Sequence, residues 1–306
     1  MNRPPHDPQP IASRMAARAR ALTLERLRAL RSGLGACPEA DLLRRLELRI
    51  VRKDLDLPRF PDVAILLSRT MAEPNLTVPR IVEVVRQDPE VVHQVVAAAS
   101  TSHFARSPKT LDQAIVRMGL ARVWKVGVGQ ALERVAFLVP HQQEAVAALR
   151  DRGLFIGELA ERLAGEGRGP HYMAGLFEPV GEMLVHRDAP PSRSGRAPAA
   201  AFVRRLAADV RQLLSFLAVC EWGIGDECAS AIWFHGDPSR APEAFRRTAA
   251  LVAVAERTVA VVADEARPCP GLPALLAAID REALGIEGLV ELAREVGDEL
   301  RGRQAA

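Results

Sequence analysis

Apolar residues recur along the chain at the spacing of helices, and the alternating pattern of strands is nearly absent. Near the amino terminus, two sets of apolar residues fall at positions i, i+3 and i+7: Leu27, Leu30 and Leu34, followed by Leu43, Leu46 and Ile50. This spacing places each set on one face of a helix. The pattern therefore predicts two helices with a break between Gly33 and Pro38.

Polar residues and prolines predict where the next helices begin and end. Asp88 is followed by Pro89, a combination that starts helices because the carboxylate can cap free amides and proline fits the first turn. Thr77 and Thr110 are expected to cap two further helices, and Gly119 is expected to end the second of them. Short helices should therefore follow one another through this part of the chain.

The second half of the chain continues the helical pattern. It predicts helices over about residues 140–163, 171–186, 199–221, 226–234 and 242–266, and a helical tail near the carboxyl end. We therefore predict an all-α protein with three regions. These are a basic helical leader (residues 1–55), a compact multi-helix bundle (56–266) and a helical tail (267–306).

Charge is unevenly distributed, although the whole chain carries only +3. Residues 1–53 hold 12 basic and 5 acidic side chains, so this part is +7 and the remainder is −4. The basic part has no aromatic side chain on which a base could stack, which disfavours nucleic acid as its partner. No apolar stretch approaches the roughly 20 residues that cross a bilayer, and the amino terminus lacks the apolar run of a signal peptide. We expect no membrane span and a cytoplasmic location.

The segment over residues 57–126 resembles the amino-terminal half of the HDOD family, the catalytically degenerate relatives of HD and HD-GYP phosphohydrolases. The match is carried by Leu57, Pro58, Pro61, Asp88, Pro89, Ala114 and Gly119. Segments 174–185, 220–225 and 232–238 are similar to later parts of the family, so the resemblance spans about residues 57–262. It implies an HD-like helical bundle and a role in bacterial signal transduction.

At the metal-binding His-Asp dyad, this sequence departs from the HD enzymes. Those enzymes need imidazole and carboxylate groups around divalent metals that activate water. The resemblance aligns the dyad position with Glu178 and Pro179, and proline offers no ligand atom. The literal pair His6-Asp7 lies in a proline-rich segment that should not hold a coordination geometry. We therefore predict a protein that is not an enzyme, with no catalytic residue, no metal ligand and no cofactor.

Seven polar residues of the second half could in principle form another metal site: His171, Glu178, His186, Asp226, His235, Asp237 and Glu256. In one continuous helix, His171 and His186 would lie roughly 22 Å apart along the axis and could not share an ion. Asp226 is expected to cap a helix, His235 to end one, and Glu256 to be solvated or ion-paired. If a metal were bound, Glu178, His235 and Glu256 would be the residues to examine.

These observations predict a regulatory module that binds a signalling protein, with the leader and the tail as its contact surfaces. Two alternatives stay open. One is a sensor that binds a cyclic dinucleotide or another nucleotide through arginines and a tryptophan. The other is a residual metal-dependent phosphohydrolase or phosphodiesterase. Trp124, Trp222 and Trp233 are expected to anchor the core or an interface.

Overall fold

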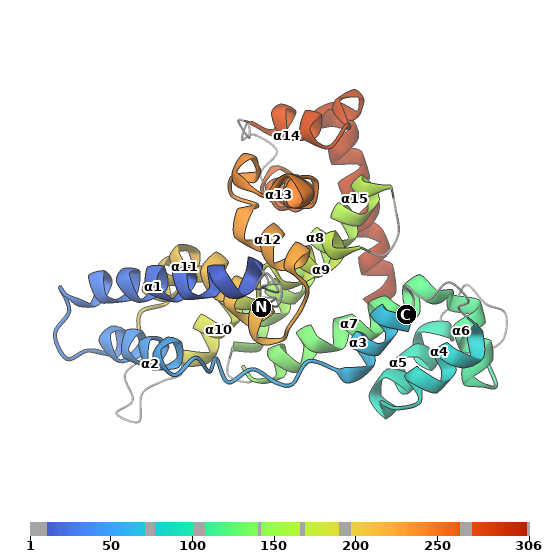
Figure 1. Ribbon diagram of the computed structural model, residues 1–306, viewed down its shortest axis with the longest axis horizontal. Helices are drawn as coiled ribbons and strands as arrows, with labels where there is room; N and C mark the ends of the chain where they lie inside the picture. Colours follow the sequence, from blue (N-terminus) through green and yellow to red (C-terminus); the bar gives the residue numbers. More distant parts are fainter. Residues whose placement is uncertain are drawn as a thin grey trace, which may run out of the picture.

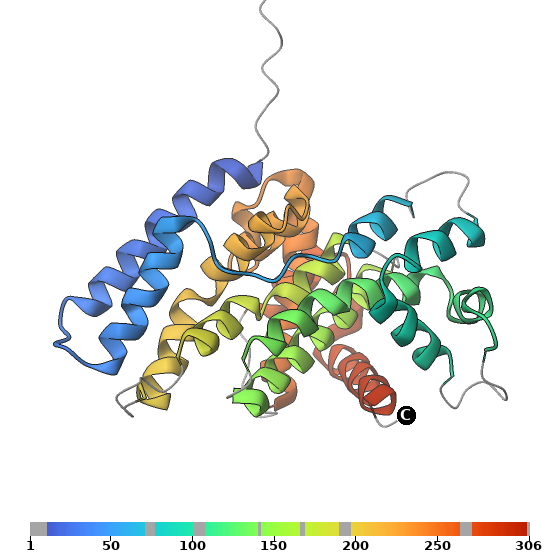
Figure 2. The same cartoon turned by 90° about the horizontal axis from the view of Figure 1, so that it is seen from below.

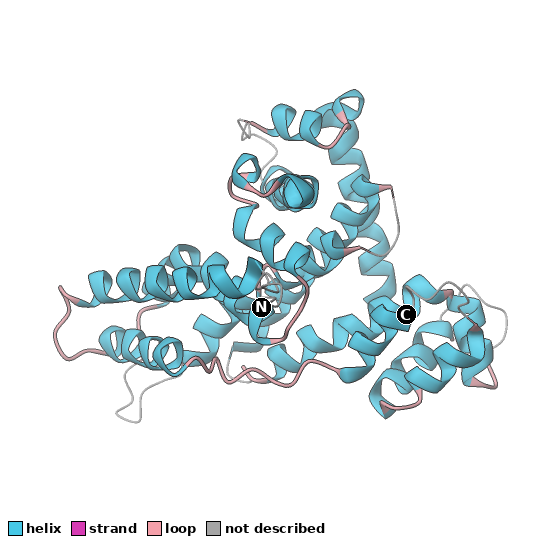
Figure 3. Ribbon diagram, in the orientation of Figure 1, coloured by secondary structure: helices cyan, strands magenta, loops and turns pink. Residues whose placement is uncertain are grey.

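The computed structural model of the chain describes residues 11–70, 77–100, 108–139, 142–165, 169–189, 197–263 and 271–304. Over these residues the secondary structure is helical and contains no strand, which confirms the predicted fold class (Figure 3). The pair His6-Asp7 lies outside the described residues. None of the described helices combines the length and the apolar character that a membrane-spanning segment needs.

The elements follow one another in this order: α1 (Ile11–Arg31), α2 (Pro38–Arg52), α3 (Asp62–Thr70), α4 (Val78–Val85), α5 (Pro89–Ala99), α6 (Leu111–Met118), α7 (Leu120–Phe137), α8 (Gln143–Ala164), α9 (Pro170–Phe177), α10 (Val180–Asp188), α11 (Ala200–Glu221), α12 (Asp226–Phe234), the 3-10 turn η2 (Pro238–Arg240), α13 (Glu243–Ala263), α14 (Leu272–Ala278), the 3-10 turn η3 (Glu282–Leu284) and α15 (Gly285–Gln304). Helices α1 and α2 lie at one end of the molecule and α3–α6 at the other (Figures 1 and 2). Helices α8–α13 form the middle, where α15 packs along α8 and α13.

The leader is a helical hairpin that packs on the bundle. The predicted break lies between Arg31 and Pro38, and α1 contacts α2, α11 and α12. Leu27 and Leu43 are fully buried, as their helical spacing requires. Arg49 of α2 makes an ion pair with Asp188 of α10, with 2.7 Å between Nε and Oδ2. The leader is thus joined to the bundle by both apolar and polar contacts.

The local capping signals set the helix boundaries as predicted. Oδ1 of Asp88 accepts hydrogen bonds from the amides of Glu90 (3.0 Å) and Val91 (3.4 Å) at the start of α5. The hydroxyl of Thr110 accepts a hydrogen bond from the amide of Gln113 at 3.2 Å. Gly119 separates α6 from α7 at φ 73°, a conformation that favours glycine. Thr77 occupies the N-cap position of α4, but its side chain makes no capping hydrogen bond.

An aromatic cluster links the start of the bundle to α11. The indole nitrogen of Trp222 donates a hydrogen bond to the carbonyl oxygen of Pro58 at 3.0 Å. The Trp222 ring lies 5.6 Å from the Phe60 ring and 5.2 Å from the Phe177 ring, between centroids. Trp222 and Trp124 are buried, as expected for core anchors, whereas Trp233 is only half-buried.

The prediction of one continuous helix from His171 to His186 is wrong. Helix α9 ends at Phe177 and α10 begins at Val180, with Glu178 and Pro179 between them. Pro179 has no amide hydrogen, and its ring interferes with the preceding helical turn, so the helix breaks here. The break places Glu178 at a corner inside the bundle.

Two glycines allow the helices around this corner to approach closely. A Cβ atom on Gly175 of α9 would lie 2.7 Å from the amide nitrogen of Gly157 in α8. A Cβ atom on Gly181 of α10 would lie 2.1 Å from the carbonyl oxygen of Arg211 in α11. Glycine is therefore required at both positions, and α11 lies directly against the start of α10.

Candidate functional site

Six ionisable side chains from different helices meet inside the bundle, and we call them the charge cluster. They are Arg152 on α8, Glu178 at the α9–α10 corner, Glu182 on α10, Arg211 on α11, His235 at the end of α12 and Glu256 on α13. The side chain of Glu178 is 0% exposed and that of His235 only 4%. Charged groups at this depth must be paired.

Glu178 lies between two guanidinium groups. Its Oε2 atom is 3.1 Å from Nη2 of Arg152, and its Oε1 atom is 3.0 Å from Nη1 of Arg211. Arg152 also contacts Glu182, with 3.0 Å between Nη2 and Oε2, and Arg211 also pairs with Glu256. The two arginines therefore neutralise the carboxylates of the cluster, and each arginine connects two of them.

His235 completes the cluster on the side of α13. Its Nδ1 atom is 2.7 Å from the carbonyl oxygen of Ile232, and its Nε2 atom is 3.4 Å from Oε2 of Glu256. Both ring nitrogens of His235 therefore face acceptor oxygens, one from the backbone of its own helix and one from α13.

The surroundings shift the pKa values of two members. Burial would raise the pKa of Glu256, but the charges of His235 and Arg211 and a hydrogen bond from Arg211 lower it below its ordinary value. Burial would lower the pKa of Arg211, but Glu178 and Glu256 raise it above its ordinary value. Glu256 and Arg211 are therefore both held in their charged forms.

The prediction that Asp226 caps its own helix is wrong. Gly225 occupies the N-cap position of α12, and Asp226 is the first helical residue. Oδ1 of Asp226 instead accepts a hydrogen bond at 3.1 Å from the amide of Ala12, near the start of α1. Asp226 therefore caps the leader helix, where free amides and the helix dipole favour a carboxylate.

The remaining sequence candidates are distributed as follows. Glu178, His235 and Glu256 come together, each offering a ligand atom within 4.8 Å of the others. Within the described part of the chain, His171 and His186 are not members of this group, and the α9–α10 corner separates them. Asp237 lies outside it as well, and its Oδ1 accepts a hydrogen bond from the hydroxyl of Ser239 at 2.6 Å. His235 ends α12, as predicted.

The arginines of the cluster were missed at the level of the sequence. Arg211 lies within the buried stripe of α11, between Ala207 and Leu214, and an arginine at such a position signals a buried charge partner. Arg152 offers no comparable signal, because it follows Arg150 and Asp151 in a locally charged stretch. Its role depends on the α9–α10 corner, which brings Glu178 to it.

The residues present do not fit the resident metal centre of an HD phosphohydrolase. Such a centre holds dications through imidazoles and carboxylates. Here one imidazole and two carboxylates converge, but both carboxylates already contact guanidinium groups. A dication among these ligand atoms would lie beside Arg211, and like charges at short range in a buried site repel strongly.

Comparisons with known proteins agree with the fold. The model of the HDOD domain family matches residues 57–235. No curated protein matches the chain. A solved HDOD domain protein with unknown function from Geobacter sulfurreducens is similar at a TM-score of 0.62 and 17% identity, covering 93% of this chain and 97% of that one.

Two further solved structures carry different functional names. A "putative signal transduction protein" from Marinobacter aquaeolei VT8 has a TM-score of 0.59 and 21% identity, covering 82% of this chain and 59% of its own. A "putative metal-dependent phosphohydrolase" from Shewanella amazonensis SB2B has a TM-score of 0.54 and 16% identity, covering 83% of this chain and 97% of its own. At these identities the likeness shows a shared HD-like helical fold.

Proposed function

The chain belongs to the HDOD family, and from this membership we propose that it is a signalling protein that binds a protein partner and catalyses no reaction. One observation carries the proposal. The buried Glu178, at the position that the family resemblance aligns with the metal-binding dyad, is ion-paired to Arg152 and Arg211. Guanidinium groups neutralise the carboxylate there, and they cannot activate a water molecule as a divalent metal does.

The charge cluster is well suited to a structural role. Its members come from α8, α10, α11, α12 and α13 and from the α9–α10 corner, so it connects most of the central helices. Buried ion pairs seldom add net stability over apolar packing, but they can favour one arrangement of helices over others. We propose that the cluster fixes the relative positions of these helices and thereby the shape of the surface that they present.

The partner surface that we propose is α2 of the leader. Leu48 and Val51 lie three positions apart on one face of α2, and their side chains are 47% and 57% exposed. Arg44 and Arg52 are exposed beside them on the same helix. An exposed apolar pair within a basic surface fits a partner that has apolar anchors and an acidic rim.

Affinity capture with the intact chain tests this proposal. We expect Leu48→Glu and Val51→Glu to abolish capture of an acidic signalling partner from the native cell. Both side chains are exposed, so the fold should persist. Val116→Glu on α6, where the valine is 64% exposed, is the matched control and should leave capture unchanged. Equal capture by all variants would contradict α2 as the partner surface.

A metal-dependent phosphohydrolase is the competing candidate, and the convergence of Glu178, His235 and Glu256 favours it. This candidate requires the ion pairs of Arg211 to open so that an ion can enter. It predicts bound metal and turnover, both of which the binding-module proposal excludes.

A further inference from the structure

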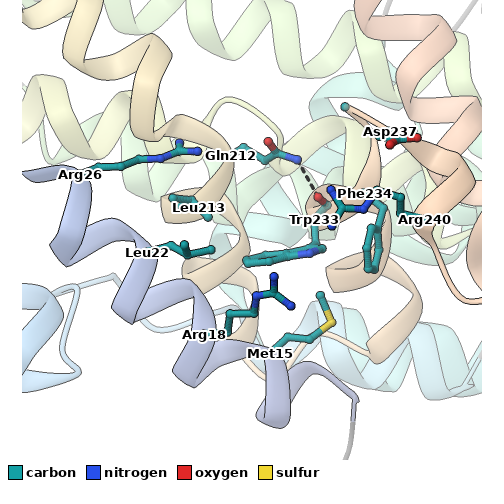
Figure 4. Close-up of a pocket in the computed structure, with 11 residues that line it drawn as sticks. Met15, Arg18, Leu22, Arg26, Gln212, Leu213, Trp233, Phe234, Asp237 and Arg240 are labelled. Atoms are coloured by element: carbon teal, nitrogen blue, oxygen red, sulfur yellow. Dashed lines mark hydrogen bonds between the residues drawn. The ribbon is translucent and has the colours of Figure 1, made fainter.

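A cavity of about 390 Å³ lies where the leader meets α11 and α12, on residues that neither the charge cluster nor the proposed partner surface uses. Its lining includes Arg18, Arg26, Gln212, Trp233, Phe234 and Arg240 (Figure 4). This volume falls within the range of roughly 300–1,000 Å³ that is typical of small-molecule sites.

Three arginines give the cavity an excess of positive charge. Arg18 and Arg26 extend from α1 and Arg240 from η2, whereas Asp237 is the one acidic residue among the described residues of the lining. Nη1 of Arg26 donates to the carbonyl oxygen of Asp209 at 2.5 Å, an acceptor that carries no formal charge. Among the residues that the structure describes, no hydrogen bond or ion pair involves the guanidinium of Arg18 or of Arg240. Free guanidinium groups around a hollow favour a phosphate, which they can bind through two parallel hydrogen bonds.

The other wall is aromatic and apolar. The indole of Trp233 lies across the middle of the cavity, with Phe234 beside it and the guanidinium of Arg18 pointing toward it (Figure 4). Leu22 and Leu213 extend this wall. An aromatic wall next to a phosphate site fits a planar base, because base–aromatic contacts are favourable for any base.

A side-chain amide supplies a polar group at the same wall. Nε2 of Gln212 donates to the carbonyl oxygens of Trp233 (2.6 Å) and Ile232 (3.3 Å), which fixes the orientation of the amide. Within the described part of the chain, Oε1 of Gln212 has no hydrogen-bond donor. This oxygen can therefore accept a hydrogen bond from a ligand N–H group, such as the exocyclic amine of a base.

We propose that this cavity binds a nucleotide of mononucleotide size. Arg18 and Arg240 contact the phosphate, Arg26 adds positive charge at the edge of the cavity, and the base packs against Trp233 and Phe234. The inference goes beyond the proposed partner binding and does not depend on it. Because α1 supplies two of the arginines and lies outside residues 57–235, a bound nucleotide would connect the leader to α12 of the family region.

Isothermal titration calorimetry on the intact chain tests the proposal. The probes are the four ribonucleoside monophosphates, cyclic di-GMP, the corresponding nucleosides and inorganic phosphate. We expect at least one monophosphate to bind in the micromolar range. Its nucleoside and inorganic phosphate should each bind at least about tenfold more weakly, since each lacks half of the contacts.

Substitutions locate the binding. Arg18→Ala and Arg240→Ala should each weaken nucleotide binding at least about tenfold, because each removes a charge-assisted contact. Trp233→Phe should weaken nucleotide binding but leave the affinity for inorganic phosphate unchanged. Arg28→Ala removes an equal charge from an exposed position of α1 that does not line the cavity, and it should change nothing. Unchanged thermal melting of the arginine variants shows that the fold is kept.

Three outcomes would overturn the proposal. The first is that no phosphate-bearing probe releases or absorbs heat at high micromolar concentration. The second is that Arg28→Ala and Arg18→Ala lose the same affinity for the nucleotide. The third is that cyclic di-GMP binds more tightly than any monophosphate. Capture of a protein partner through α2 would be unaffected by any of them, so this inference and the proposed function fail separately.

Discussion

Replacing Arg211 by methionine tests the charge cluster through the stability of the fold. The substitution keeps much of the aliphatic length of the side chain and removes its guanidinium. Glu178, which is 0% exposed, then keeps only Arg152 as its cationic neighbour, and Glu256 keeps only His235. A buried carboxylate, Glu178, and a half-buried one, Glu256, would each lose a neutralising charge.

The expected loss follows from the cost of breaking a buried pair on one side, which is about 3–5 kcal/mol. Since Arg152 and His235 still compensate part of the charge, we expect Arg211→Met to lower the free energy of unfolding by about 3 kcal/mol. The double variant Arg211→Met/Glu178→Gln also removes the charge of Glu178 that Arg211 neutralised. Its loss in free energy of unfolding should therefore be smaller than the sum of the losses in Arg211→Met and Glu178→Gln by about 1–3 kcal/mol.

Urea denaturation followed by far-UV circular dichroism measures these free energies. Arg28→Met, on an exposed position of α1, is the control and should stay within about 0.5 kcal/mol of the unsubstituted chain. An Arg211→Met loss as small as that of the control, or strictly additive losses in the double variant, would refute the idea that these charges are buried and coupled.

Three further predictions concern acid stability, helix packing and a helix cap. The pKa of Glu256 in the folded protein lies below its ordinary value of 4.5. The ionised Glu256 therefore contributes its full stabilisation at pH values above 4.5, and this stabilisation is lost as the pH falls below 4.5 toward the folded pKa. Glu256→Gln should therefore flatten the acid limb of a plot of unfolding free energy against pH. Gly181→Ala should lower the thermal midpoint strongly, because the new methyl group would meet the carbonyl of Arg211, whereas Gly225→Ala, with no atom within 4 Å of the added Cβ, should change it little. Asp226→Ala should cost about 1 kcal/mol in urea denaturation, since it removes the cap at the start of α1.

Local signals made much of the fold predictable. Asp88, Thr110 and Gly119 mark helix boundaries because each acts on amides or dihedral angles within a few residues of itself. The apolar spacing of Leu27 and Leu43 likewise identified the buried faces of the leader. A proline signal was overlooked at Pro179, and the helix that was predicted to be continuous is broken there.

The candidate site was harder to predict because it forms only through tertiary contacts. Glu178, His235 and Glu256 were identified as the residues to examine, but their convergence depends on the α9–α10 corner and on the packing of α12 against α13. Arg152 and Arg211 are ordinary surface residue types, and their burial against Glu178 follows from that packing. A search for metal ligands in the sequence does not consider cations, so it could not find the groups that neutralise this site.

Metal content together with phosphodiester turnover tests the central claim most directly. The intact chain, grown with added iron, manganese and zinc, is analysed by inductively coupled plasma mass spectrometry and assayed with bis-p-nitrophenyl phosphate. We predict substoichiometric metal and a turnover equal to that of Glu178→Gln. Stoichiometric metal would contradict the account if Glu178→Gln and His235→Ala abolished the turnover and Glu287→Gln, at an exposed position of α15, retained it.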